Sequence, residues 1–227
     1  MQYQTATPIG TIATEQNKVL RNTYMMLSLT MIPTVIGAFI GMSMNFSFMA
    51  ASPIMSSLLM FGAMMGMMFA VSALRNSIWG IAALFGFTLL AGVLLGPILQ
   101  MALHLKNGAQ LIGMAAGGTG IIFFSLATIA TVTKKDFSFM GKFLFIGLIL
   151  LIVASLANLF FQIPALSLTI SAIGVLIFSA YILYDVSRIV NGGETNYVMA
   201  TLGLFLSISN LFISLLQLLM AFSGERD

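Results

Sequence analysis

The sequence contains no cysteine, which excludes disulfides, thiolate chemistry and cysteine-based metal sites together. It contains a single histidine, His104, and one imidazole without a partner argues against both a metal site and a Ser–His catalytic pair. Neither the Gly-x-Ser-x-Gly nucleophile motif nor the His-Glu-x-x-His zinc motif occurs. We therefore expect no enzymatic activity, no cofactor and no bound metal.

Charged residues are also scarce, at 7% of the 227 residues, whereas soluble domains carry about 25%. Hydrophobic residues make up 59%, so too few polar side chains remain to cover a water-facing surface. The net charge of +3 comes from only nine basic and six acidic side chains, which is too sparse for nucleic-acid binding. The composition predicts an integral membrane protein that lies in a lipid bilayer and has no nucleic-acid partner.

Seven apolar stretches are long enough to cross the hydrocarbon core, which takes roughly 20 residues in a helix. They cover residues 24–44, 54–74, 79–99, 110–132, 140–161, 164–189 and 197–222. Because the connectors are short, we expect an all-α, seven-transmembrane-helix bundle without a second domain. The predicted organisation is an N-terminal tail at 1–22, one bundle at 23–222 and a short C-terminal stub at 223–227.

Basic residues in short loops set the orientation of a membrane protein. With the N-terminus in the cytoplasm, two basic residues, Lys106 and Arg226, fall on the outer side. The cytoplasmic side then holds Lys18, Arg21, Arg75, Lys134, Lys135 and Arg188, and also Lys142 if its side chain extends back to the headgroups. This bias predicts a cytoplasmic N-terminus and an outer C-terminus.

Glycines recur at four-residue spacing in three of the stretches, at Gly37 and Gly41, at 62 and 66, and at 113 and 117. In lipid such positions let helix backbones approach closely. Close packing within the bundle is the simplest interpretation, with dimerisation or gating as alternatives.

The sixth and seventh stretches each carry a stripe of small and polar residues at alternating spacings of three and four, which places each stripe on one helical face. The sixth has Ser167, Ser171, Gly174, Phe178, Tyr181, Asp185 and Arg188, and the seventh has Gly203, Ser207, Asn210, Ser214, Gln217 and Ala221. We expect the two faces to meet inside the bundle. The polar groups there are either a functional site or hydrogen bonds that hold the helices together.

Asp185 favours the functional interpretation, because an ionisable group inside a membrane is costly. Arg188 stands three residues later and is expected to pair with it. The candidate ion or proton site comprises Asp185, Arg188, Ser207 and Asn210. Glu194, in the turn that follows, is expected to cap the last helix.

Several segments resemble the BAX inhibitor-1 (transmembrane BAX inhibitor motif) family. They are GPI at 96–98, KKDFSF at 134–139 and ILYD at 182–185. Three more are similar to its bacterial YccA type: NKVLRNTY at 17–24, LGPIL at 95–99 and GGETNY at 192–197. The likeness extends from about residue 17 to the end of the last stretch.

The resemblance implies six helices around a central one in the bacterial inner membrane, and two distinct activities. One is binding and inhibition of FtsH, the membrane-bound ATP-dependent protease. The other is a pH-sensitive calcium or cation leak, gated by two aspartates and an arginine. Asp185 matches the first aspartate, Ser207 stands where the second is expected, and the arginine aligns near Arg75.

Two carboxylates can share a proton and one alone cannot, so this departure favours the protease modulator over the leak. The tail agrees with this interpretation, because a protease that pulls on a cytosolic end needs a handle. We expect the partner-binding tail to include Glu15, Lys18 and Arg21, partly helical from Glu15 onward.

Overall fold

The computed structural model describes residues 9–47 and 51–224, with side chains from Gln16 onward. Every regular element in these ranges is a helix. The bounds are α1 Ile9–Ser43, α3 Pro53–Leu74, α4 Ile78–Leu94, α5 Gly96–Leu103, α6 Gly108–Thr133, the short 3₁₀ helix η1 Ser138–Met140, α7 Gly141–Phe161, α8 Pro164–Val190 and α9 Tyr197–Gly224.

The prediction of seven spanning helices is confirmed, since seven segments of the described chain are long and apolar enough to cross a membrane. The third of them, Ile78–Leu103, contains both α4 and α5. The two helices are separated at Leu95, because Pro97 has no N–H to continue the hydrogen-bond ladder of α4. Many large apolar side chains point outward, as in Phe143 and Leu176, which suits a lipid-facing surface.

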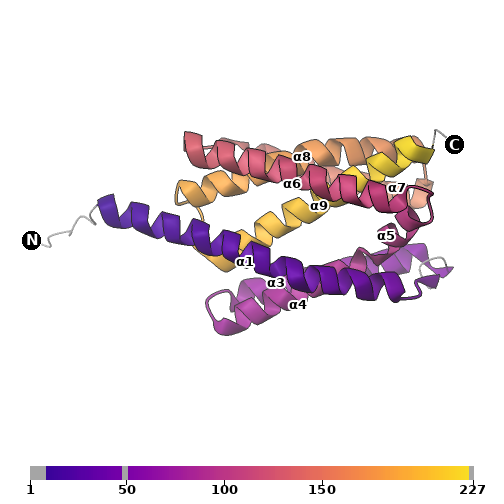
Figure 1. The fold of residues 1–227 in the computed structure, drawn as a ribbon, viewed down its shortest axis with the longest axis horizontal. Helices are drawn as coiled ribbons and strands as arrows, with labels where there is room; N and C mark the ends of the chain where they lie inside the picture. The colour runs from indigo at the N-terminus through magenta and orange to yellow at the C-terminus, as the bar shows by residue number, and fades with distance from the viewer. Residues whose placement is uncertain (1–8, 48–50, 225–227) are drawn as a thin grey trace, which may run out of the picture.

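Helix α9 runs through the middle of the bundle, between a group formed by α1, α3 and α4 and a group formed by α6 and α8 (Figure 1). It packs against α1, α3, α4, α5, α6 and α8. Helix α7 packs on α8 instead and makes no contact of this kind with α9 along the described chain. Because α4 and α5 form one span, five spans surround α9 and α7 lies at the edge, so the arrangement of six helices around one that the family resemblance implies is met only in part.

The closest backbone approach is between α1 and α4. Gly37 faces the Leu89 carbonyl, where a Cβ would lie 2.1 Å from the oxygen, and Gly92 faces the Thr34 carbonyl at the same distance. Gly41 is similarly close to the end of α4. No side chain larger than hydrogen fits at these positions, so the glycine spacing in α1 reflects packing within the bundle, as predicted.

The other two glycine pairs behave differently. A Cβ on Gly62 or Gly66 of α3 would meet nothing within 4 Å, and the same holds for Gly113 and Gly117 of α6. The expected packing of these pairs inside the bundle is therefore wrong for the single chain. Spacing along a helix shows that small residues share a face, but it does not show which way that face points.

Helix α1 begins well before the first apolar stretch. It starts at Ile9, six residues before the expected helical start at Glu15. Val19 and Leu20 already pack against the core of the bundle, and the side chain of Gln16 lies against Gly192 in the α8–α9 turn. The end of the expected tail is thus part of the folded bundle, and residues 1–8 lie outside the described structure.

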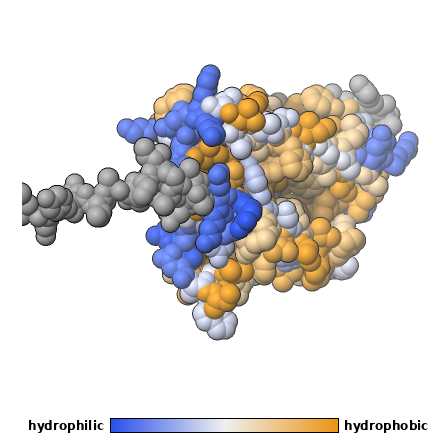
Figure 2. Space-filling view, turned by 60° about the vertical axis from the view of Figure 1, so that its left-hand side comes forward, coloured by the Kyte–Doolittle hydropathy of each residue, from blue (hydrophilic) through white to orange (hydrophobic). Residues whose placement is uncertain are grey.

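The two ends of the bundle differ in polarity. Because the spans alternate in direction, the start of α1 and the ends of α3, α6 and α8 share one end, which carries Arg21, Arg75, Lys134 and Arg188. Figure 2 shows hydrophilic residues gathered at this end, while most of the remaining surface on the face shown is hydrophobic. This charge asymmetry underlies the predicted orientation, which remains a prediction; Arg226 lies outside the described residues.

Candidate functional site: the polar seam between α8 and α9

The two polar stripes meet along the contact between α8 and α9, which we call the polar seam. Ser171 donates a hydrogen bond to Gln217 Oε1 over 2.7 Å. One turn further along, Gly174 leaves room for Ser214, whose hydroxyl would lie 2.6 Å from a Cβ at that position. The prediction that these faces meet in the bundle is therefore confirmed at several levels.

Asp185 and Ser207 form the polar centre of the seam. The Ser207 hydroxyl is 3.2 Å from Asp185 Oδ2 and 3.1 Å from the backbone oxygen of Gly203. A hydroxyl has one proton to donate, so Asp185 shares it with the carbonyl of Gly203. Ser207 is buried and Asp185 is partly buried, which leaves the carboxylate with few polar neighbours inside the seam.

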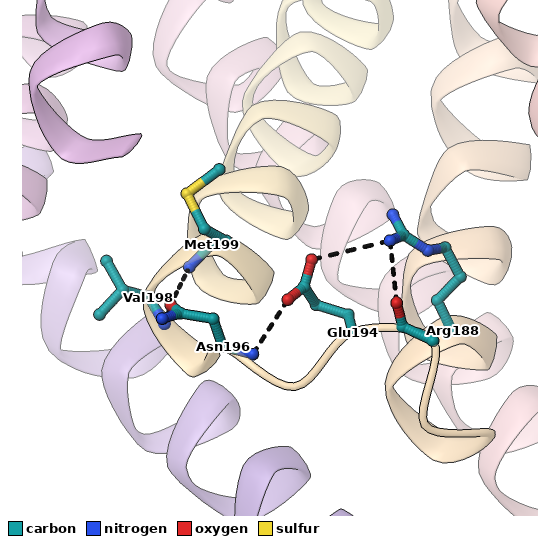
Figure 3. A network of polar contacts seen from close by, with 6 residues as sticks. Arg188, Glu194, Asn196, Val198 and Met199 are labelled. Atoms are coloured by element: carbon teal, nitrogen blue, oxygen red, sulfur yellow. Dashed lines mark hydrogen bonds and ion pairs between the residues drawn. The ribbon is translucent and has the colours of Figure 1, made fainter. Parts of the chain in front are cut away.

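Arg188 does not form the expected ion pair with Asp185. Its Nη2 donates to the backbone oxygen of Gly193 over 3.0 Å and lies 3.7 Å from Glu194 Oε2 (Figure 3). The guanidinium also lies over the ring of Tyr184, 5.5 Å from its centroid. The reason is that α8 ends at Val190, and the turn that follows folds back to bring its acceptors to Arg188. Because both charged side chains are partly exposed, the pair contributes little to stability.

Asn196, rather than Glu194, caps α9. Its Oδ1 accepts hydrogen bonds from the backbone N–H groups of Val198 and Met199, as Figure 3 shows. Glu194 Oε1 accepts from the N–H of Asn196 itself over 2.9 Å, so it orients the cap residue. The prediction that Glu194 caps α9 is therefore wrong: Asn196 is the cap, and Asn is among the residues most favoured at this position.

Two further candidates do not reach Asp185. The amide of Asn210 donates to the backbone oxygen of Leu206 on its own helix. Arg75, which aligned with the arginine of the family's gate, is exposed at the end of α3. Its backbone oxygen accepts from the Asn196 side chain. Of the four predicted site residues, Asp185 and Ser207 are in contact, whereas Arg188 and Asn210 donate to nearby backbone oxygens.

A cavity of about 420 Å³ lies at the far end of the seam. Its polar lining is neutral and includes Ser167 and Gln217 of the seam, together with Asn158 and Gln162 at the end of α7. Asp185 stands 18 residues after Ser167, or about 27 Å along the helix. The Ser171–Gln217 hydrogen bond and the close Gly174–Ser214 contact lie between them.

Several polar contacts were not predicted from the sequence. The Gln100 amide donates to carbonyls at the end of α1 and just beyond it, those of Gly41, Met42 and Met44. Ser187, fully buried, donates to Lys135 O and accepts from the N–H of Phe137. Gln100 gave a signal as a single polar residue within an apolar stretch, where a buried polar group needs a partner, whereas Ser187 lies between Asp185 and Arg188 and did not stand out.

The tail candidates are spread along α1. Lys18 and Arg21 are exposed, and nothing is described of the Glu15 side chain. Neither basic side chain forms an ion pair with another described side chain. Their part in partner binding stays a prediction.

These features define the class of protein: a polytopic helical membrane protein with a central last helix and a single carboxylate in a polar seam. Among the described residues no three acidic, histidine or cysteine side chains come together as a metal site would require.

The sequence of this bundle matches the profile of a family described as "Inhibitor of apoptosis-promoting Bax1" over residues 16–224. The chain belongs to this family, which confirms the resemblance to the BAX inhibitor-1 proteins. It is 41% identical over 203 residues to a protein of Escherichia coli K12 named "Modulator of FtsH protease YccA", covering 89% of this chain and 90% of that one.

Two other relatives are similar over nearly the same length. One, from Vibrio cholerae, is named "Uncharacterized membrane protein" and is 43% identical over 205 residues, or 90% of each chain. The other, from Escherichia coli O6:H1, is named "Inner membrane protein YccA" and is 41% identical over 203 residues, or 89% of this chain and 90% of that one.

Proposed function

We propose that this protein binds and inhibits the membrane-bound ATP-dependent protease FtsH in the bacterial inner membrane. The observation that carries the proposal is the 41% identity, over nine tenths of its length, to a relative named as a modulator of that protease. The seam supports it, because Ser207 replaces the carboxylate that a two-aspartate gate would need.

We also infer that the protein acts by association and has no catalytic activity of its own. The names of its family and relatives describe an inhibitor, a modulator and membrane proteins. The one histidine, His104, lies in an exposed turn, where its Nδ1 is 2.6 Å from the backbone oxygen of Gln100, a group that can only accept a hydrogen bond. That position suits an interfacial side chain.

The structure refines which part of the N-terminus could serve as the handle. Val19 and Leu20 are packed against the core, so residues from Gln16 onward are held by the bundle. The segment before Gln16 is then the part that a protease can grip. A bundle that resists unfolding would hold the protease on that segment and slow its action on other substrates.

The test is a pulse-chase measurement of the half-life of a known membrane substrate of FtsH. It compares cells that lack this protein, express it whole, or express it without residues 2–15. A matched control replaces residues 2–15 with a Gly/Ser segment of equal length, which keeps the length and removes the sequence. We expect the whole protein to lengthen the half-life and the truncated one to have no effect.

Each outcome separates the handle from the partner. If the Gly/Ser control inhibits as well as the whole protein, length alone is what the protease needs. If the truncated protein inhibits fully, the handle is elsewhere although the modulator function stands. If no form changes the half-life or co-purifies with FtsH, the modulator proposal fails.

The orientation has its own test, because a chain without cysteine allows single-cysteine labelling. Lys18→Cys lies near the start of the spanning part of α1, and Lys106→Cys lies in the turn between α5 and α6, at the opposite end. In intact cells a membrane-impermeant maleimide should label Lys106→Cys and spare Lys18→Cys until the membrane is opened. The reverse pattern would place the N-terminus outside and remove the cytosolic handle.

The second candidate function is a pH-sensitive calcium or cation leak, and the partly buried Asp185 in the polar seam favours it. Purified protein in liposomes would then conduct cations, and Asp185→Asn would change that flux and its dependence on pH. Glu194→Gln is the matched control, since it neutralises a carboxylate outside the seam. Equal flux in the parent and Asp185→Asn would remove Asp185 from any conduction.

A further inference from the structure

A groove of about 380 Å³ separates α1 from α6 near the end where α1 begins. The two helix backbones are not in contact along the described chain. They are bridged instead by the rings of Tyr24 and Phe123, which meet edge to face at 6.1 Å. The walls are largely apolar and include Leu27 and Ala127, with the hydroxyl of Thr128 near the rim.

An unsatisfied hydroxyl lies within this groove. Tyr24 Oη is buried and forms no hydrogen bond of ordinary geometry with the described residues. The Thr131 hydroxyl is close by, but it donates its only proton to Ala127 O over 2.7 Å, so it cannot donate to Tyr24 Oη and could act only as an acceptor. A buried tyrosine hydroxyl normally has a partner, and Tyr24 Oη, which has none among the described residues, is available to an occupant of the groove.

Basic residues lie one turn beyond the lining residues of the groove on both helices, toward the end where α1 begins. Arg21 lies one turn before Tyr24 on the same face of α1, and Lys134 and Lys135 follow Thr131 by one turn at the end of α6. All three are exposed. One acidic residue, Asp136, is also present there, and its Oδ1 is engaged by the Ser138 N–H. The mouth is therefore net positive and complements an anionic group.

Size decides between the possible occupants. A helix about 10 Å across fills roughly 420 Å³ in a single 5.4 Å turn, which already exceeds the whole groove. A partner helix could lie over the groove but could not enter it. An acyl chain is narrow enough to enter, and a lipid brings an anionic phosphate to the basic mouth and ester oxygens to the Tyr24 hydroxyl.

We propose that the groove between α1 and α6 is a binding site for an anionic phospholipid. One acyl chain lies along Leu27, Phe123 and Ala127, the Tyr24 hydroxyl donates to an ester oxygen, and the phosphate is held by Arg21 and the Lys134–Lys135 pair. The lipid belongs to the leaflet at the end where α1 begins. This site is separate from the polar seam and uses none of its residues.

Native mass spectrometry of the full chain, with phosphatidylglycerol or phosphatidylethanolamine added in detergent, tests the proposal. Phosphatidylglycerol should be retained in preference to the zwitterionic lipid. Arg21→Gln should lower its retention about fivefold, the effect of one basic side chain near an anionic lipid. Lys106→Gln, which removes a basic side chain at the other end, should leave retention unchanged.

Two variants inside the groove separate this site from general attraction to charge. Tyr24→Phe keeps the ring and should weaken retention a few-fold through loss of one hydrogen bond. Thr128→Trp fills the groove from its exposed rim and should abolish preferential retention. If Thr128→Trp fails to fold, Tyr24→Phe and Arg21→Gln still decide, since the first is isosteric apart from its hydroxyl and the second is exposed.

The contrary outcomes are equally definite. Equal retention of the two lipids, or an undiminished preference in both Tyr24→Phe and Arg21→Gln, would overturn the proposal. Displacement of the lipid by millimolar glycerol 1-phosphate would show a phosphate site without an acyl chain, which also overturns it. Loss of FtsH co-purification in Thr128→Trp with lipid retention intact would assign the groove to a protein partner.

Discussion

The α1–α4 contact and the polar seam both use small residues on neighbouring helices, yet they hold their helices together in different ways. In the first, Gly37 and Gly92 let backbone meet backbone. In the second, small residues make room for a carboxylate, hydroxyls and amides that bond across the helices. The first contact contains nothing that a proton or ligand could alter. The second contains polar groups whose bonding can change, and this difference marks it as the candidate functional site.

The largest effect should follow from breaking the glycine contact. A Cβ at Gly92 would lie 2.1 Å from the Thr34 carbonyl oxygen, which belongs to backbone and cannot move aside. Gly92→Ala should lower the free energy of unfolding by about 1–3 kcal/mol or more, measured by SDS titration in mixed micelles. Gly113→Ala adds the same methyl group in open space and should change it by less than about 0.5 kcal/mol. Equal effects would mean that the α1–α4 approach is looser than the structure has it.

A smaller effect is expected at the centre of the seam. Ser207→Ala removes the hydroxyl shared between Asp185 and Gly203, and a net loss of about 1 kcal/mol is typical of one hydrogen bond. A double-mutant cycle with Asp185→Asn isolates the contribution of that pair. A coupling energy near zero would show that the Ser207 proton stays on the Gly203 carbonyl and that the two residues are neighbours without a bond.

The Ser171–Gln217 bond at the other end of the seam should contribute less. Hydrogen bonds between membrane helices average about 0.6 kcal/mol, and Gln217 is exposed beside the cavity. A cycle of Ser171→Ala and Gln217→Ala should therefore give a coupling of this size or below. A value larger than that of the Asp185–Ser207 pair would reverse the ranking and move the polar centre toward the cavity.

The sequence predicted the spans well because hydropathy and helix length decide them directly. It also predicted that the two stripes meet, since spacings of three and four fix a helical face. The sequence could not show that the glycine pairs of α3 and α6 lack a packing partner, because the direction in which a helical face points depends on how the other helices pack around it. Gly92 and Gly96 carried the same four-residue signal as Gly37 and Gly41 and could have been included.

The error at Arg188 has a different cause. Within a helix, Asp185 is the natural partner at three residues. The turn after Val190, however, brings Gly193 and Glu194 back toward Arg188. The path of that turn, and not helical spacing, therefore decides which groups Arg188 contacts. Local periodicity predicts contacts inside one element, and it fails where a turn supplies competing groups.

Asp136 provides the smallest expected effect and a contrast with Asp185, because it lies in the exposed turn between α6 and η1. Hydrogen bonds from Ser138 hold the pKa of its carboxyl below the ordinary value of 3.8. A lowered pKa in the folded state means that the stabilisation is present above pH 3.8 and is lost as the pH falls below it. Asp136→Asn should abolish this contribution, so the difference in Tm between parent and variant should shrink between pH 6 and pH 3. A difference that stays constant with pH would show that the turn does not depend on the charge of Asp136, and would leave Asp185 as the carboxylate to examine for any dependence on acid.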